Sequence, residues 1–153
     1  MSVDESANSL GPKVLTMRVV TFAMIWGVAM YLGYVLSQGV LRQPIQGNRL
    51  APLGIVSAAI ALAAQFLTPV LIRTPRQAGV DSEQFLSIFF TRHIINLALL
   101  EGSAFFNTLA LMNEHHWWSL AIVVVLLLAM LVQWPTRTRL EQFLETARME
   151  ASL

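Results

Sequence analysis

The chain of 153 residues contains no cysteine, which excludes disulfide bonds, thiol chemistry and metal sites built on cysteine. Charged residues are also scarce. They make up 12% of the chain, about half of the roughly 25% that is usual in soluble domains. The formal net charge is only +1, and no basic run interleaved with aromatic residues is present. We therefore expect no nucleic-acid partner.

Hydrophobic residues make up 56% of the chain, and most of them fall into four long apolar runs. A helix of about 20 such residues crosses the ~30 Å hydrocarbon layer of a bilayer. We therefore predict an all-α integral membrane bundle of four transmembrane helices, with the lipid bilayer as its solvent. The expected helices lie at about 19–41, 53–72, 82–112 and 117–134.

Polar extensions flank the predicted transmembrane domain, which covers residues 19–134. Residues 1–18 form a polar N-terminal tail, and the apolar run after it is too long for the core of a signal peptide, so we expect an uncleaved anchor. Pro135 ends the fourth helix. The C-terminal tail, residues 135–153, predicts an amphipathic helix on the membrane surface or, alternatively, docked on a partner. Its apolar side chains recur at helical spacing: Leu140, Phe143, Leu144 and Ala147.

The basic residues predict an orientation because cytoplasmic segments of membrane proteins carry an excess of Lys and Arg. With a cytoplasmic N-terminus, only Arg42 and Arg49 of the ten basic residues fall outside. We therefore predict a multi-pass protein of the cytoplasmic (inner) membrane with both termini cytoplasmic. The link 42–52 is short and rich in turn formers, which predicts an antiparallel hairpin of the first two helices. The inside residues are Lys13, Arg18, Arg73, Arg76, Arg92, Arg137, Arg139 and Arg148.

The third predicted helix carries polar side chains on two faces, which suggests a central place in the bundle. One face is an intramembrane polar stripe whose members lie within about 60° of each other on a helical wheel. Gln65 of the second helix lies at a depth similar to that of Asn96, and Pro69 leaves the Gln65 carbonyl without its helical hydrogen bond, so a polar spot forms there. We therefore predict a contact between Gln65 and Asn96. The stripe consists of Arg92, Asn96, Ser103 and Asn107.

The other polar face holds Glu101, which falls near the bilayer midplane. A carboxyl group there is costly, so this helix needs neighbouring helices in order to insert. Burial favours the neutral form of a carboxyl group, and we expect Glu101 to be uncharged. A structural Glu101 would be sealed against helix neighbours and donate one hydrogen bond. A proton- or ion-handling Glu101 would lie beside a cavity or at a subunit interface with access to water.

The segment 98–106, ALLEGSAFF, resembles the carboxylate-bearing helix of the rotary ATPase proteolipid, subunit c. The tripeptide Arg42-Gln43-Pro44 resembles the polar loop of that family. The resemblance implies that Glu101 carries a proton or sodium ion and that the protein forms a ring. The first helix, however, lacks the closely repeated glycines of a proteolipid.

A second resemblance is to the four-helix membrane glutathione transferases, whose motif has Arg followed four residues later by Asn and then by Glu. Arg92 and Asn96 have this spacing, and Glu101 comes two residues late. The resemblance implies a membrane-bound small-molecule transferase.

The three histidines are candidate ligands of a metal ion or a haem. His115 and His116 follow Glu114, but adjacent histidines do not share a helix face and no paired ligand at helical spacing completes a site. We interpret them as an interfacial turn. His93 lacks a second intramembrane histidine for haem ligation. We expect no metal and no cofactor.

These observations favour a non-enzymatic accessory or scaffold component of the membrane, as a homo-oligomer or in a membrane complex. The alternative is a proton- or sodium-translocating subunit that uses Glu101. A second alternative is the transferase.

Overall fold

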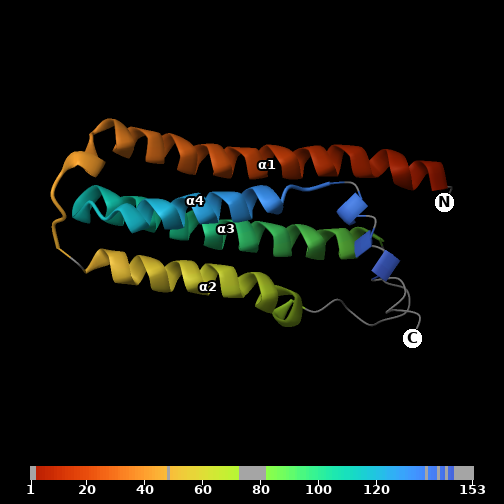
Figure 1. Cartoon of the computed structure of the whole chain (residues 1–153). Helices are drawn as coiled ribbons and strands as arrows, with labels where there is room; N and C mark the ends of the chain where they lie inside the picture. Colours follow the sequence, from red (N-terminus) through yellow and green to blue (C-terminus); the bar gives the residue numbers. More distant parts are fainter. Residues whose placement is uncertain are drawn as a thin grey trace.

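The structure is a computed structural model that describes residues 3–47, 49–72, 82–136, 138–140, 142–143 and 145–146, with side chains from residue 11 and, in the third stretch, from residue 85. The described part is all-helical and contains no strand. Four long helices follow one another in antiparallel order (Figure 1). They are α1 (Val3–Ser37), α2 (Leu50–Leu71), α3 (Ser82–Glu114) and α4 (Trp117–Val132), and a short 3-10 helix, η1 (Val40–Arg42), follows α1.

Three of these helices are long and apolar enough to cross a membrane: Gly11–Ser37 in α1, Leu50–Leu71 in α2 and Phe85–Glu114 in α3. α4 has 16 residues, roughly 24 Å at 1.5 Å per residue, which is shorter than the ~30 Å hydrocarbon layer. Large apolar side chains are exposed along the outer faces of the helices, for example Phe66 at 82% and Trp26 at 55%. Such a surface is typical of a protein that lies in lipid.

α3 is the central helix, as its two polar faces predicted. It packs against α1, α2 and α4. α1 and α2 lie on opposite sides of the α3–α4 pair (Figure 1). The predicted hairpin of the first two helices is therefore wrong as a packed pair: the two are antiparallel, but α3 and α4 separate them. The link between α1 and α2 is long enough to cross the ends of α3 and α4.

The helix bounds differ from the predicted ones for identifiable reasons. α1 begins at Val3, not at 19, because hydropathy marks where a helix enters lipid and not where it begins. It ends at Ser37, not at 41, because Gly39 takes a left-handed conformation with φ 70°, which terminates a helix. α4 ends at Val132, not at 134, because the residue before Pro135 is disfavoured in the α conformation.

The described part of the C-terminal tail docks on this chain's own bundle, and its predicted place at the membrane surface stays a prediction. Leu140 is 1% exposed and packs with Val14 of α1 and Leu86 of α3. The Phe143 ring lies 5.1 Å from the Phe89 ring. The predicted apolar positions Leu144 and Ala147 lie outside the described residues.

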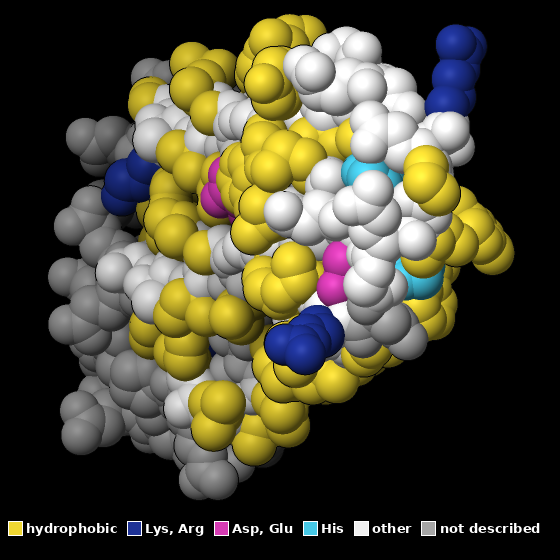
Figure 2. Space-filling view, turned by 90° about the vertical axis from the view of Figure 1, so that its left-hand side faces the viewer, with side chains coloured by type: hydrophobic (Ala, Val, Ile, Leu, Met, Phe, Trp, Pro, Cys, Tyr) yellow, Lys and Arg dark blue, Asp and Glu magenta, His cyan; other side chains and the backbone are white. Residues whose placement is uncertain are grey.

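The described Lys and Arg residues are divided unequally between the two ends of the molecule, and only Arg42 and Arg49 lie at the end that holds the loop 38–49. The described residues nearest the two chain ends, at the start of α1 and after Pro135, lie at one end of the molecule, together with Lys13, Arg18, Arg92 and Arg139. The other end holds the loop 38–49 and the turn between α3 and α4. Figure 2 looks onto that second end, where acidic, histidine and Lys or Arg side chains lie scattered among other polar atoms and hydrophobic side chains. The predicted inside residues Arg73, Arg76, Arg137 and Arg148 lie outside the described part.

Candidate functional site

The predicted polar stripe of α3 forms the interface with α2. In the half near the turn, the Ser103 hydroxyl lies 3.0 Å from the Ser57 hydroxyl. The Asn107 amide donates to the Gly54 carbonyl at 3.0 Å and to the Ser103 carbonyl at 2.9 Å. Every residue of the stripe meets α2, so these polar groups hold two helices together.

Gly54 allows this close approach. A Cβ at position 54 would lie 2.3 Å from Asn107 Oδ1, which is an impossible contact. Asn107 is fully buried, and Oδ1 has no hydrogen-bond partner among the described residues. The missing Cβ leaves a Cα–H group facing this oxygen, and weak Cα–H···O contacts are common where helices pack closely.

A second polar layer joins α2, α3 and α4 nearer the chain ends. The Gln65 amide donates to the Asn96 backbone carbonyl at 3.4 Å, and the Thr68 hydroxyl lies 2.6 Å from Asn96 Oδ1. The Gln133 amide donates to Gln65 Oε1 at 2.7 Å. The predicted contact between Gln65 and Asn96 is confirmed, but it uses the main chain of Asn96, and the side chain of Asn96 meets Thr68. Thr68 and Gln133 were not predicted as partners.

Arg92 lies at the C-terminal end of α2. Its Nε donates to the Ile72 carbonyl at 2.8 Å, and its terminal nitrogen donates to the carbonyls of Ile72 and Pro69. The last carbonyls of a helix lack partners within the helix, and a cation is favoured there by the helix dipole. Arg92 therefore caps α2.

Glu114 caps the other end of α2, and this role was not predicted from the sequence. Its carboxylate accepts hydrogen bonds from the backbone N–H groups of Arg49 at 2.6 Å, Leu50 at 2.7 Å and Ala51 at 2.8 Å. These are the unpaired first donors of a helix. The partners lie 63 to 65 residues away in the sequence, so no local pattern indicates this cap.

Through Arg92 and Glu114, α3 caps both ends of α2. α2 has 22 residues, roughly 33 Å of helix, and Arg92 and Glu114 are also roughly 33 Å apart along α3 at 1.5 Å per residue. Because the helices are antiparallel, each charge of α3 meets the helix-dipole end of opposite sign. The contacts at the two ends fix the register of α2 on α3.

Glu101 lies on the opposite face of α3, towards α1. It is half-buried, and a Cβ built on Gly27 of α1 would lie 3.8 Å from its Oε1 and 3.8 Å from the Phe105 ring. It makes no hydrogen bond or ion pair with any described residue. Arg92 and Asn96 face α2, so the three residues of the transferase-like spacing do not converge.

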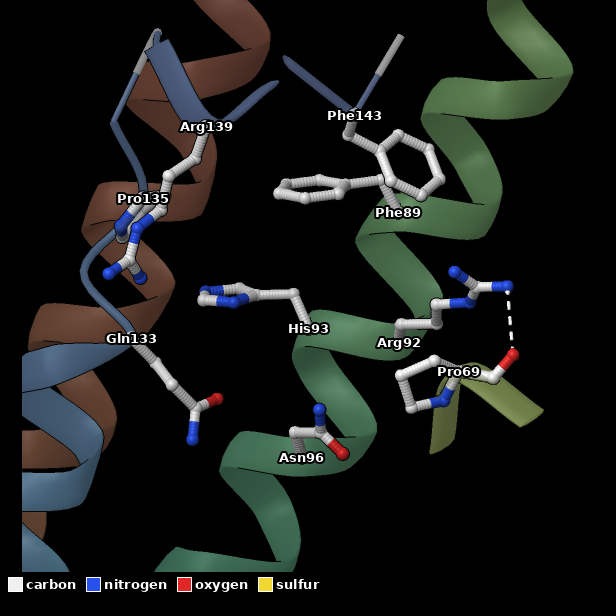
Figure 3. Close-up of a pocket in the computed structure, with 9 residues that line it drawn as sticks. All are labelled: Pro69, Phe89, Arg92, His93, Asn96, Gln133, Pro135, Arg139 and Phe143. Carbon is white, nitrogen blue, oxygen red and sulfur yellow. Dashed lines mark hydrogen bonds between the residues drawn. The ribbon is translucent and has the colours of Figure 1, made fainter. Parts of the chain in front are cut away.

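A pocket of about 250 Å³ lies between α3, α4 and the tail, near the chain ends (Figure 3). Arg92, His93 and Arg139 line it, together with the amides of Asn96 and Gln133. Two phenylalanine rings and two prolines complete the described wall, and none of the described lining residues is acidic. Figure 3 shows the His93 ring extending from α3 towards the segment that follows α4.

The histidines make contacts that organise the turn and the pocket. His115 Nδ1 lies 3.0 Å from the Pro44 carbonyl, and His116 Nε2 lies 3.3 Å from the Gly47 carbonyl, so both join the turn to the loop 38–49. His93 Nε2 lies 2.9 Å from the Thr21 hydroxyl of α1. Within the described residues no group of three His, Cys, Asp or Glu side chains is arranged to hold a metal ion.

The chain matches no protein-family model, no curated protein and no solved structure. The resemblances to the proteolipid and to the membrane transferases therefore stay predictions.

Proposed function

We propose that the chain is a four-span, non-enzymatic component of the cytoplasmic membrane that assembles with other membrane helices through Glu101. The four-span topology is supported by the antiparallel packing of α4 along α3, because a shorter helix can cross the bilayer when it packs against a longer one. Cytoplasmic termini are supported by the described basic residues at that end, because Lys and Arg are enriched on the cytoplasmic side.

The observation that carries the proposal is the lack of a partner for Glu101 within the described chain. At 1.5 Å per residue it lies roughly 14 Å along α3 from Arg92 and roughly 20 Å from Glu114. It is therefore far from both polar ends. Within hydrocarbon an unsatisfied polar group is costly, and interhelical hydrogen bonds are the usual remedy.

The surface beside Glu101 suits a docking helix. Ile94 and Ala98 lie seven and three residues before Glu101 on the same side of α3, and both are exposed, Ile94 at 44%. Gly102 has no atom within 4 Å of the position that a Cβ would take. An approaching helix thus meets a shallow surface in which a small residue allows close contact.

The test is self-association of the full-length chain in liposomes. Because the chain has no cysteine, a Gln46→Cys variant provides a single site for donor and acceptor dyes at an exposed position. Energy transfer is then measured against the protein-to-lipid ratio. We expect Glu101→Leu to weaken association about 3- to 20-fold, as the loss of one interhelical hydrogen bond of ~0.6–1.7 kcal/mol implies. Glu101→Gln should associate normally because it keeps a donor. Unchanged association of Glu101→Leu would refute the proposal.

Proton handling by Glu101 is the second candidate, favoured because this carboxyl group is half-buried and not sealed by neighbours. The same variants separate the two functions. A proton carrier must ionise, so Glu101→Gln would abolish proton flux into dye-loaded liposomes under an imposed potential. A purely structural carboxyl group predicts no such flux in the unaltered protein.

A further inference from the structure

The pocket between α3, α4 and the tail has the chemistry of an anion site. Its described wall carries two arginines and a histidine and no acidic side chain. Arg139 uses one N–H group in a hydrogen bond of 2.7 Å to the Val132 carbonyl, whereas a guanidinium has five donors. The described residues therefore leave Arg139 with further hydrogen-bonding capacity beside the pocket.

The position of the pocket favours a membrane lipid as its ligand. It opens near the chain ends, where the membrane location proposed above puts the headgroup layer of the cytoplasmic leaflet. On α2, Phe66 lies one turn from the pocket residue Pro69 and is 82% exposed, and Val70, four residues after Phe66 on the same side of the helix, is 59% exposed. An acyl chain has an apolar surface to follow there. At about 250 Å³ the pocket falls below the roughly 300–1,000 Å³ of sites that enclose a drug-sized ligand, so it suits a headgroup.

We propose that this pocket binds the phosphate group of an anionic membrane lipid, with Arg139 and His93 as the principal donors. If the Thr21 hydroxyl donates to His93 Nε2, at their distance of 2.9 Å, the ring proton is on Nδ1 and is available to the ligand. The phosphate supplies the negative charge that the described wall lacks. Basic pockets between transmembrane helices on the cytoplasmic side are suited to such headgroups. The inference rests on the membrane location, but not on any role of Glu101.

The test uses the full-length protein in a neutral detergent. Its thermal unfolding is followed while dioctanoylphosphatidylglycerol, dioctanoylphosphatidylcholine or inorganic phosphate is added. We expect saturable stabilisation by the phosphatidylglycerol and a much smaller effect of the zwitterionic phosphatidylcholine. Arg139→Gln should weaken phosphatidylglycerol binding about fivefold or more, since one basic residue is worth about that factor at a lipid surface. Arg42→Gln removes the same charge at the other end of the molecule and should leave binding unchanged.

Further arms keep the test decisive. Arg139→Lys retains the charge, and we expect it to bind more tightly than Arg139→Gln even if both variants are less stable without lipid. Equal stabilisation by inorganic phosphate would overturn the lipid as the source of the ligand. Binding that is the same in Arg139→Gln and Arg42→Gln would overturn the site itself. Because the measurement needs no self-association, its failure is distinct from a failure of the Glu101 proposal.

Discussion

Replacing Glu114 by alanine removes the acceptor for three backbone N–H groups at the start of α2. The three hydrogen bonds are short, at 2.6, 2.7 and 2.8 Å, and Glu114 is only 5% exposed. Water therefore has little room to replace the carboxylate. The N–H groups of Leu50, which is half-buried, and of Ala51, which is buried, would lose their hydrogen-bond acceptor.

The expected cost is about 2–4 kcal/mol. Loss of an ordinary N-terminal cap costs about 0.5–2 kcal/mol. A hydrogen bond to a charged group contributes about 1.5–3 kcal/mol, but three bonds to one carboxylate are not additive. The favourable interaction with the helix dipole, about 0.3–1 kcal/mol or more when partly buried, is lost as well. Glu114→Gln keeps one acceptor oxygen, and we expect it to lose about half as much.

The measurement is reversible unfolding in mixed micelles with increasing dodecyl sulfate, followed by fluorescence of the four tryptophans. Hydrogen exchange at Leu50 and Ala51 gives a local readout, which should accelerate in Glu114→Ala. The control is Glu145→Ala, which removes an exposed carboxylate in the tail and should change stability by less than about 0.5 kcal/mol. If Glu114→Ala matched this control in stability and in exchange at α2, the capping argument would be wrong.

Two further predictions concern the α2–α3 interface and use the same unfolding assay. Gly54→Ala should cost about 1–3 kcal/mol, because its Cβ would lie 2.3 Å from Asn107 Oδ1, whereas Gly33→Ala, with no atom within 4 Å, should be neutral or slightly stabilising. Equal effects of the two glycine variants would contradict the close approach. Thr68→Val keeps the shape but removes the hydroxyl that lies 2.6 Å from Asn96 Oδ1, and it should cost about 0.6–1.7 kcal/mol. Thr68→Ser should keep most of the stability, and a Thr68→Val variant as stable as the parent would show that this contact contributes nothing.

Much of the α2–α3 interface could be predicted from helical periodicity. Arg92, Asn96, Ser103 and Asn107 recur on one side of a helix, and polar groups on one side of an apolar helix need a polar neighbour. All four meet α2 in the structure. The partner atoms could not be predicted, because they include backbone carbonyls whose position depends on how closely the two helices approach.

The packing order of the helices and the place of the tail could not be predicted. Hydropathy identifies each apolar run but not its neighbours, because one apolar helix can pack against any other. The sequences of α1 and α2 therefore do not predict that α3 and α4 separate them. The tail offered Leu140 as an apolar position. Leu140 is buried because the fold brings Val14 of α1 and Leu86 of α3 together at the end of the bundle where the tail begins.

The amino-acid sequence by itself determined that the chain forms long apolar helices, three of them long enough to cross a membrane, because both properties follow from the local density and spacing of apolar residues. It also determined that Glu101 falls in the middle of a long apolar helix. Tertiary structure alone decided that Glu114 and Arg92 cap α2 and that Glu101 is left without a partner in the described chain. The physical reason is that a cap pairs a charge with backbone groups distant in sequence, and their meeting depends on the register between two packed helices.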